Sequence, residues 1–335
     1  MTRATSGAEG VRVGGRHDRG ASARGRRPPS GAAGVRVQGR HDGGASARVR
    51  RAPGGKLEVF VLGAGKVGTA LARALRARSV TTTLRPARKD LPRTIDANVV
   101  VLAVRDRDLR PLAERLRDAR LVPRNAVVLH VAGALDAEPL APLRPQCAGV
   151  AQMHPMISFA SRRFTPSLAG GGVHVQGDAR AVARARRLAR VLGMTPRTVA
   201  GLDTVGYHAA AGLVANGAAA LAAVGAELLS RSGVPDDLAP KMLGPLLRSV
   251  AENVESLGFP DALTGPVRRG DAAAVEKHMK TLGAKLPRAM PLYLAAAEAQ
   301  LPLARAIGEA PDTNFDAISR LLEPVRPRAP AGTRA

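Results

Sequence analysis

The chain has 335 residues, enough for two domains of ordinary size, each with its own hydrophobic core. A single cysteine, Cys147, excludes an internal disulfide and is typical of a reducing, cytoplasmic compartment. The formal net charge of +24 favours anionic ligands, but only 2% of the residues are aromatic, so the chain lacks the basic-aromatic pattern of a nucleic-acid stacking surface. Nucleic acid is therefore not an expected partner.

Residues 1–55 contain a near-perfect repeat with a period of 24, GVRVGGRHDRGASARGRR at 10–27 and GVRVQGRHDGGASARVRR at 34–51. Because the repeat has almost no large apolar side chains, it cannot bury enough surface to offset its ordering entropy, and we expect a disordered tail. Two interpretations stay open. Either the natural start lies later and upstream repeat DNA is being translated, or the tail contacts RNA, a membrane or a partner.

The composition of the sequence changes at residue 57. The apolar run LEVFVL at 57–62 predicts a buried strand, and an Ala/Leu-rich helix follows over 69–78. Between them lies a glycine-rich loop. The first glycine permits a tight turn, the second lets the backbone approach a pyrophosphate, and the third lets the helix pack on the strand. This pattern predicts a dinucleotide-binding loop made of Gly63, Ala64, Gly65, Lys66, Val67 and Gly68.

The preference between the two nicotinamide cofactors depends on the end of the second strand, predicted at 80–84. Arg85 stands where a protein that prefers NAD places an acidic residue, and Arg88 and Lys89 follow closely. Guanidinium groups bind a 2′-phosphate through charge-assisted hydrogen bonds. The sequence therefore predicts NADP as the cofactor, with NAD as the possible alternative.

Further buried strands are predicted at 97–104, 126–131, 172–177 and 198–200, with helices at 109–121 and 178–192. The helix that normally follows the second strand is nearly absent, because prolines interrupt that span. We expect an α/β fold of the Rossmann type, a doubly wound parallel sheet, over residues 56–201.

Residues 202–310 are predicted to form an all-α substrate and dimerisation domain, followed by a C-terminal helix and tail over 311–335. The first helix, 204–229, is long enough for a membrane span, but it is rich in Ala and Gly and carries polar side chains. We interpret it as a buried central helix of an α-helical domain, with packing across a dimer axis as one form of that burial, and expect no membrane association. The remaining helices are predicted at 235–257, 271–282 and 291–307, with Asp271 capping its helix.

Five motifs occur in a fixed order: GAGKVGTALARAL, HVAG at 130–133, HPMISF at 154–159, YHAAAGLVAN at 207–216 and ALTGPVRRGD at 262–271. Together they resemble the bacterial family that joins a Rossmann-like domain to domain of unknown function 2520, over roughly residues 56–310. That family is similar in architecture to pyrroline-5-carboxylate reductase, ketopantoate reductase and 6-phosphogluconate dehydrogenase. The resemblance implies a 6-phosphogluconate-dehydrogenase-like C-terminal domain, a nicotinamide cofactor and a homodimer.

Three positions depart from the pattern of this family and its relatives. Ala132 replaces a usual serine, Val104-Arg105 stands where proline usually precedes Asp106, and Gly212 stands where related hydroxyacid dehydrogenases carry lysine. The lysine mechanism of those relatives therefore cannot be transferred. Val104 and His130, at the ends of two predicted strands, are assigned to the cofactor site.

Hydride transfer needs one group that supplies or accepts a proton, and histidine suits this role near neutral pH. His154, expected in a loop at the ligand-binding edge of the sheet, is the first candidate. His208 and Asn216 lie eight residues apart on one helix and can face the same cleft. Thr264 and Arg269, in the turn before the Asp271 cap, are candidates for binding a substrate carboxylate. The histidines show no metal-ligand spacing, so no metal is expected.

These features predict an NADP-dependent oxidoreductase that transfers hydride between the cofactor and a small, anionic carbonyl, imine or hydroxy compound. The alternative is a non-catalytic regulator that binds NADP(H), which the missing lysine and serine would permit.

Overall fold

The computed structural model describes residues 55–88 and 90–323. The predicted N-terminal tail, Lys89 and the end of the predicted C-terminal segment lie outside these residues.

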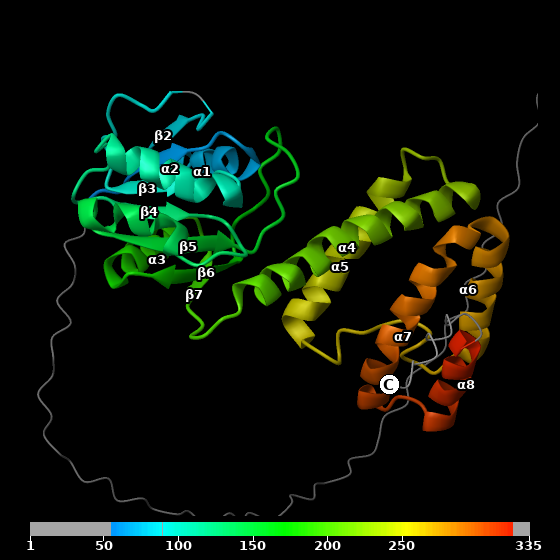
Figure 1. Ribbon diagram of the computed structural model, residues 1–335. Helices are drawn as coiled ribbons and strands as arrows, with labels where there is room; N and C mark the ends of the chain where they lie inside the picture. Colours follow the sequence, from blue (N-terminus) through cyan, green and yellow to red (C-terminus); the bar gives the residue numbers. More distant parts are fainter. Residues whose placement is uncertain (1–54, 89, 324–335) are drawn as a thin grey trace, which may run out of the picture. The chain divides into compact units, whose positions relative to one another are not determined.

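One seven-stranded sheet forms the first half of the described chain (Figure 1). The order is β2-β1-β3-β4-β5-β6-β7. Strands β1 to β5 are parallel, β6 is antiparallel to β5, and β7 is parallel to β6. From β1 the next strand in sequence, β2, lies on one side, whereas β3 and the later strands lie on the other side. Open parallel sheets bind ligands at the carboxyl ends of the strands where the strand order reverses in this way. The strands are β1 (Glu58–Leu62), β2 (Thr81–Arg85), β3 (Val99–Leu102), β4 (Val127–His130), β5 (Gly149–Pro155), β6 (Gly172–Gly177) and β7 (Thr195–Arg197).

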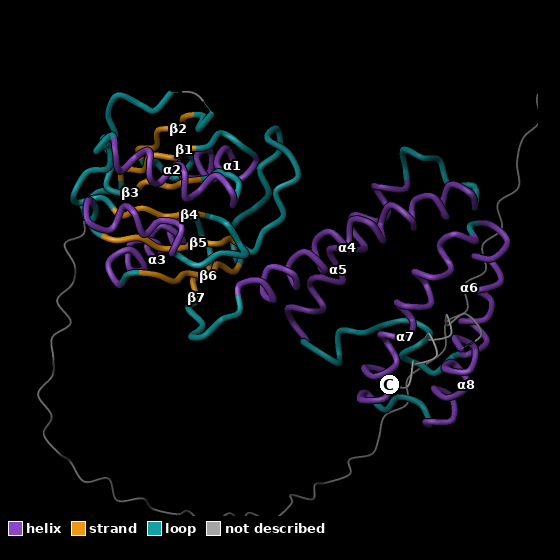
Figure 2. The backbone as a smooth tube through the Cα atoms, viewed as in Figure 1, coloured by secondary structure: helices purple, strands orange, loops and turns teal. Residues whose placement is uncertain are grey.

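Helices cover both faces of this sheet, which makes the central strands buried on both sides (Figure 2). Alternate residues of β1, β3 and β4 pack against α1 (Lys66–Arg76) and α3 (Ala179–Val191). The intervening residues pack against α2 (Asp106–Asp118) and the 3-10 helix η1 (Glu138–Gln146). This two-sided burial explains the continuous apolar runs of the sequence and confirms the predicted fold class.

The second half is helical: α4 (Thr204–Arg231), α5 (Ala239–Leu257), α6 (Ala272–Lys285), the short η2 (Pro287–Ala289), α7 (Met290–Ile307) and α8 (Asp312–Leu322). Helices α6, α7 and α8 share a small core around Phe315 and Ile318. Helix α4 packs along α5, and its C-terminal part contributes Val224 and Leu228 to a second small cluster with α6 and η2. The predicted cap is present, since Asp271 accepts a hydrogen bond from the Ala274 amide.

Three expectations need correction. The last strand is β7, earlier than the predicted 198–200, because Pro196 is tolerated in a strand at the sheet edge. His154 lies inside β5 rather than in a loop, because the antiparallel β6 extends the pairing through Pro155. Burial of α4 within its own chain is also corrected: none of its residues is buried in the single chain, and burial across a dimer axis stays a prediction. By length and composition α4 could cross a membrane, with a mean hydropathy of 1.6 over its most apolar window.

Candidate functional site

The glycine loop joins β1 to α1 with the geometry of an anion site. Gly65 occupies the N-cap position in an extended conformation, no side chain caps the helix, and no acidic residue lies in its first turn. The amides at this end of α1 are therefore available to a ligand, and the helix dipole favours negative charge there.

Each of the three glycines meets a different steric demand. A Cβ at Gly63 would collide with the Ala103 carbonyl, and Gly63 has a φ of +124°, which side chains rarely adopt. A Cβ at Gly68 would collide with the carbonyl oxygen of Gly63 and lie 3.0 Å from the Ala103 Cβ, so only glycine allows α1 this close to the sheet. Gly65 has no atom within 4 Å of the added Cβ position. Its open space forms a cradle for a ligand, so these residues fit a bound pyrophosphate.

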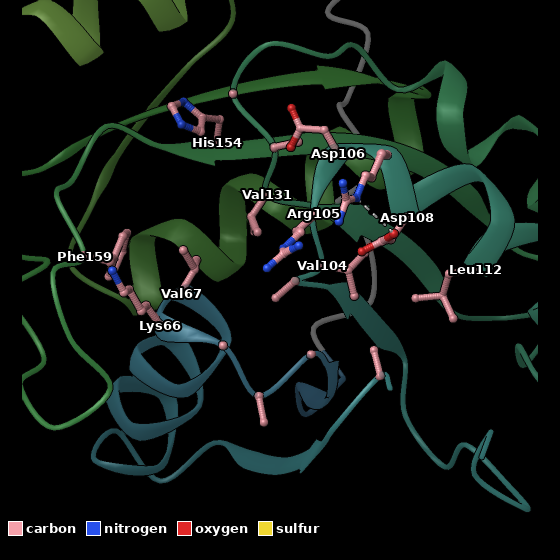
Figure 3. A pocket seen from close by; sticks show the side chains of 18 of the residues that line it. Lys66, Val67, Val104, Arg105, Asp106, Asp108, Leu112, Val131, His154 and Phe159 are labelled. Carbon is pink, nitrogen blue, oxygen red and sulfur yellow. Dashed lines mark ion pairs between the residues drawn. The ribbon is translucent and has the colours of Figure 1, made fainter. Parts of the chain in front are cut away.

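A cavity of about 1480 Å³ runs from this loop to the carboxyl ends of β4 and β5 (Figure 3). Its volume suits a ligand larger than a typical drug-sized molecule. Six cationic side chains and two acidic ones line it, and the excess of positive charge favours an anionic ligand. The charged lining residues are Lys66, Arg88, Arg105, Arg107, Arg115, Arg162, Asp106 and Asp108.

The two arginines at and just after the end of β2 lie in different environments. Arg88 lines the cavity together with Pro86 and Ala87. Arg85 is the last residue of β2, its side chain is exposed and outside the lining, and its carbonyl accepts a hydrogen bond from the Gly63 amide. Of this pair, Arg88 is therefore the one placed to reach a ligand.

Residues 131–133, after β4, line the other end of the cavity, and side chains hold this loop in place. His130 is buried, its Nε2 donates to the Asp136 carbonyl at 2.6 Å, and its Nδ1 accepts the Ala132 amide at 3.2 Å. Burial lowers the pKa of His130 despite its bond to Asp136. Gln152 donates to the Ala132 carbonyl at 2.8 Å, and the Thr204 hydroxyl donates to the Ala134 carbonyl at 3.1 Å. His130 does not line the cavity, so it shapes this loop rather than facing a ligand.

His154 and His208 meet over Gly133. A Cβ at Gly133 would lie 2.7 Å from His154 Nε2 and would collide with His208 Nδ1. The two rings pack edge-on with centroids 5.5 Å apart, and Tyr207 contacts His154 in the same manner. The structure thus brings together two of the predicted catalytic residues, one from β5 and one from α4, and both line the cavity.

His154 is uncharged at neutral pH. Its pKa is lowered to about 4, mainly because burial disfavours the charged ring, and His208, His174 and His130 lower it further through charge repulsion. A neutral imidazole can donate one hydrogen bond or accept one proton, but it cannot be the stored acid of a reaction near pH 7. In the part of the chain that the structure describes, no group of three or more His, Cys, Asp or Glu is arranged to hold a metal.

The connection from β5 to β6, residues 156–171, forms a strap along the cavity, beside α1 in Figure 1. Ile157 and Phe159 pack against the core, and Arg73 of α1 donates to the Arg162 carbonyl at 2.5 Å. Ser161 and Arg162 line the cavity. Sequence reasoning missed this wall, because only HPMISF marked it and nothing local showed which way it would fold.

The other predicted site residues lie elsewhere. Asn216 is exposed on α4, two turns beyond His208, and does not line the cavity. Thr264 and Arg269 are exposed and also outside the lining. In the motif that contains them, Arg268 is the residue with visible partners: it bonds to Glu309 at 2.6 Å and to the carbonyls of Asp261 and Leu263. Arg268 therefore holds the turn together.

Residues 172–300 match the family model described as "Domain of unknown function (DUF2520)". This match agrees with the resemblance drawn from the motifs over these residues, which are less than half of the chain. No curated protein matches the sequence.

Several solved structures share the fold. A Bacteroides fragilis protein, provisionally described as an NADP oxidoreductase, is 19% identical with a TM-score of 0.57. A Thermotoga maritima protein is 21% identical with a TM-score of 0.54. The pyrroline carboxylate reductase of Plasmodium falciparum, solved with NADP bound, is 12% identical with a TM-score of 0.50. Each similarity covers 74% of this chain and 98% of the other, and at these identities it shows a common Rossmann-like fold with a helical C-terminal region.

Proposed function

We propose that the protein is a cytoplasmic NADP-dependent oxidoreductase acting on a small carbonyl, imine or hydroxy compound. The observation that carries this proposal is the single cavity that joins the glycine loop, with its open cradle at Gly65, to the histidine pair at His154 and His208. The Plasmodium protein of the same fold, solved with NADP bound, supports the choice of cofactor class.

Different residues of the chain would bind the phosphates and the nicotinamide side of the cofactor. The amides at the start of α1 and the Lys66 ammonium would hold the pyrophosphate, and Arg88 would hold the 2′-phosphate through charge-assisted hydrogen bonds. Val104, at the carboxyl end of β3, would contact the ribose on the nicotinamide side. When bound, the cofactor supplies or accepts the hydride.

His154 is proposed as the residue that orients the reacting group. As a neutral imidazole, its Nε2 would donate a hydrogen bond to a carbonyl or imine, or accept the proton of an alcohol in the reverse direction. His208 is exposed beside it and would exchange that proton with solvent. The cations of the lining support an anionic substrate, but those nearest the glycine loop would be used by the cofactor phosphates.

The direct test measures binding and turnover separately. NADPH fluorescence titration of the purified protein should show binding, and loss of NADPH absorbance should follow with members of a panel of keto acids and cyclic imines. Absence of binding by either cofactor would contradict the proposal. Binding without turnover across the panel would support the regulator that binds NADP(H) but does not react.

We also propose that the protein is a homodimer through α4 and α5. Helix α4 carries no charged residue before Glu227, yet none of its residues is buried, and α5 buries only Ala239. A helix that is apolar all round requires cover. These two helices pack against each other and expose many large apolar side chains: Val205, Leu213, Val214, Leu221, Met242, Leu246, Leu247, Val250, Val254 and Leu257.

A charge placed on this surface tests the dimer. Leu246→Asp should convert the dimer to monomer in sedimentation equilibrium, because a desolvated carboxylate would face apolar side chains. Phe164→Asp is the matched control, since Phe164 is a similarly exposed apolar residue but lies on the strap. A monomeric wild-type protein would contradict the proposal.

A further inference from the structure

A buried polar ladder crosses the two strands next to the cavity. The β5–β6 register places His154 opposite His174 and Gln152 opposite Gln176, so all four side chains share one face of the sheet. The alternate residues on the other face belong to the apolar core with α3. Gln152, His154 and His174 are buried, at 0%, 8% and 3% exposure. Polar residues at this depth require partners.

The two rungs of the ladder are satisfied to different extents. In the glutamine rung, Gln176 donates to Gln152 at 2.9 Å, and Gln152 donates onward to the Ala132 and Gly133 carbonyls. In the histidine rung, His154 Nδ1 and His174 Nε2 are buried and have no hydrogen-bond partner within the protein. Leaving a buried polar atom without a partner destabilises a fold, so two such atoms on facing residues point to a function rather than to packing alone.

Helix α4 closes over this rung. The Tyr207 ring contacts both imidazoles, with centroids 5.5 Å from His154 and 5.7 Å from His174. The charges that act on His154 come from His208 on α4, His174 on β6 and His130 on β4. A positive charge on any of these three rings disfavours a proton on His154. The Gln176 side chain, by contrast, accepts a hydrogen bond from His174, which favours the charged form of that ring.

We propose that His174 is a positioning residue for His154: the two buried imidazoles form one acid/base unit that holds at most one proton, which adds to the effect of burial in keeping His154 neutral, with Nε2 directed at the cavity. The inference rests on the proposed role of His154 in the reaction. It extends that role to a residue that does not line the cavity and acts only through its neighbour. Facing groups that repel each other in this way titrate as a pair rather than independently.

The first experiment is a pH titration of the full-length protein by nitrogen-edited NMR of its histidine rings, with the His154 signal assigned from the His154→Gln variant. His174→Gln keeps a polar side chain, and His174→Phe keeps a ring without a charge. In both variants the His154 midpoint should rise by about half a pH unit or more, because a repelling charge has been removed. His278→Gln is the control, since His278 also pairs with a tyrosine, Tyr293, but lies on α6.

The outcomes separate positioning from a purely structural role. If His174 only fills space, its replacement lowers the melting temperature while the His154 midpoint stays where it is in the wild type, and this result would overturn the proposal. The NMR readout does not require turnover, so failure of the proposed oxidoreductase reaction would leave it interpretable. Where a substrate is found, the pH–rate profile should move in the same direction and by the same amount as the NMR midpoint.

Discussion

Replacing Arg88 by alanine is expected to weaken NADPH binding while leaving NADH binding unchanged. Arg88 lines the cavity next to the end of β2, where the 2′-phosphate of a bound cofactor would lie. A hydrogen bond to a charged group contributes about 1.5–3 kcal/mol, and about 1.4 kcal/mol corresponds to a tenfold change in affinity. Because Arg88 is exposed and its contact is screened by solvent, the lower end of this range applies, a loss of about tenfold.

Arg85→Ala is the informative control. It removes the same charge three residues away, but from a side chain outside the cavity lining, and its backbone bond to Gly63 survives the substitution. We expect less than about a threefold loss of NADPH affinity from this variant. Fluorescence titration of both variants with NADPH and NADH measures the four constants. A larger loss from Arg85→Ala than from Arg88→Ala would refute the assignment of the 2′-phosphate to Arg88.

Four further predictions concern stability and the cradle. Gly63→Ala should lower the free energy of unfolding by about 1–3 kcal/mol in urea titration, because of its positive φ and the collision with Ala103. Gly65→Ala should leave the urea midpoint unchanged but weaken NADPH binding, since its side chain would enter the open cradle; equal losses of stability in both variants would contradict this. The lowered pKa of His154, about 4 against 6.5 in the unfolded chain, makes the unfolded state bind more protons in this range. Protonation of His154 therefore lowers the free energy of unfolding by about 3 kcal/mol in total as the pH falls from about 6.5 to 4. The His154→Gln variant should lose less stability than the wild type across that pH window in denaturant titrations. Arg268→Ala should lower the melting temperature whereas its neighbour Arg269→Ala should not, because only Arg268 bonds to the turn.

The site combines features that differ in how far they could be predicted. The anion cradle is local: its strand, glycines and helix follow one another within 20 residues, and each glycine has the role that its position predicts. The choice of Arg88 over Arg85 required the directions of two nearby side chains at the end of β2, which no spacing rule supplies. The strap over the cavity depended on a contact between Arg73 and Arg162, far apart in the chain.

The sequence alone determined the elements whose signals are continuous along the chain, because buried parallel strands and Ala/Leu helices have periods that can be seen in short windows. It therefore predicted most strands of the sheet, the cofactor loop and the Asp271 cap, but it missed β5. Only the tertiary structure decided which distant residues meet. The antiparallel β6 drew His154 into a strand opposite His174, and the start of α4 brought His208 over Gly133. The tertiary structure also determined that α4 is exposed in the single chain. The sequence could not show this, because an apolar helix has the same sequence whether its own chain or a second copy covers it.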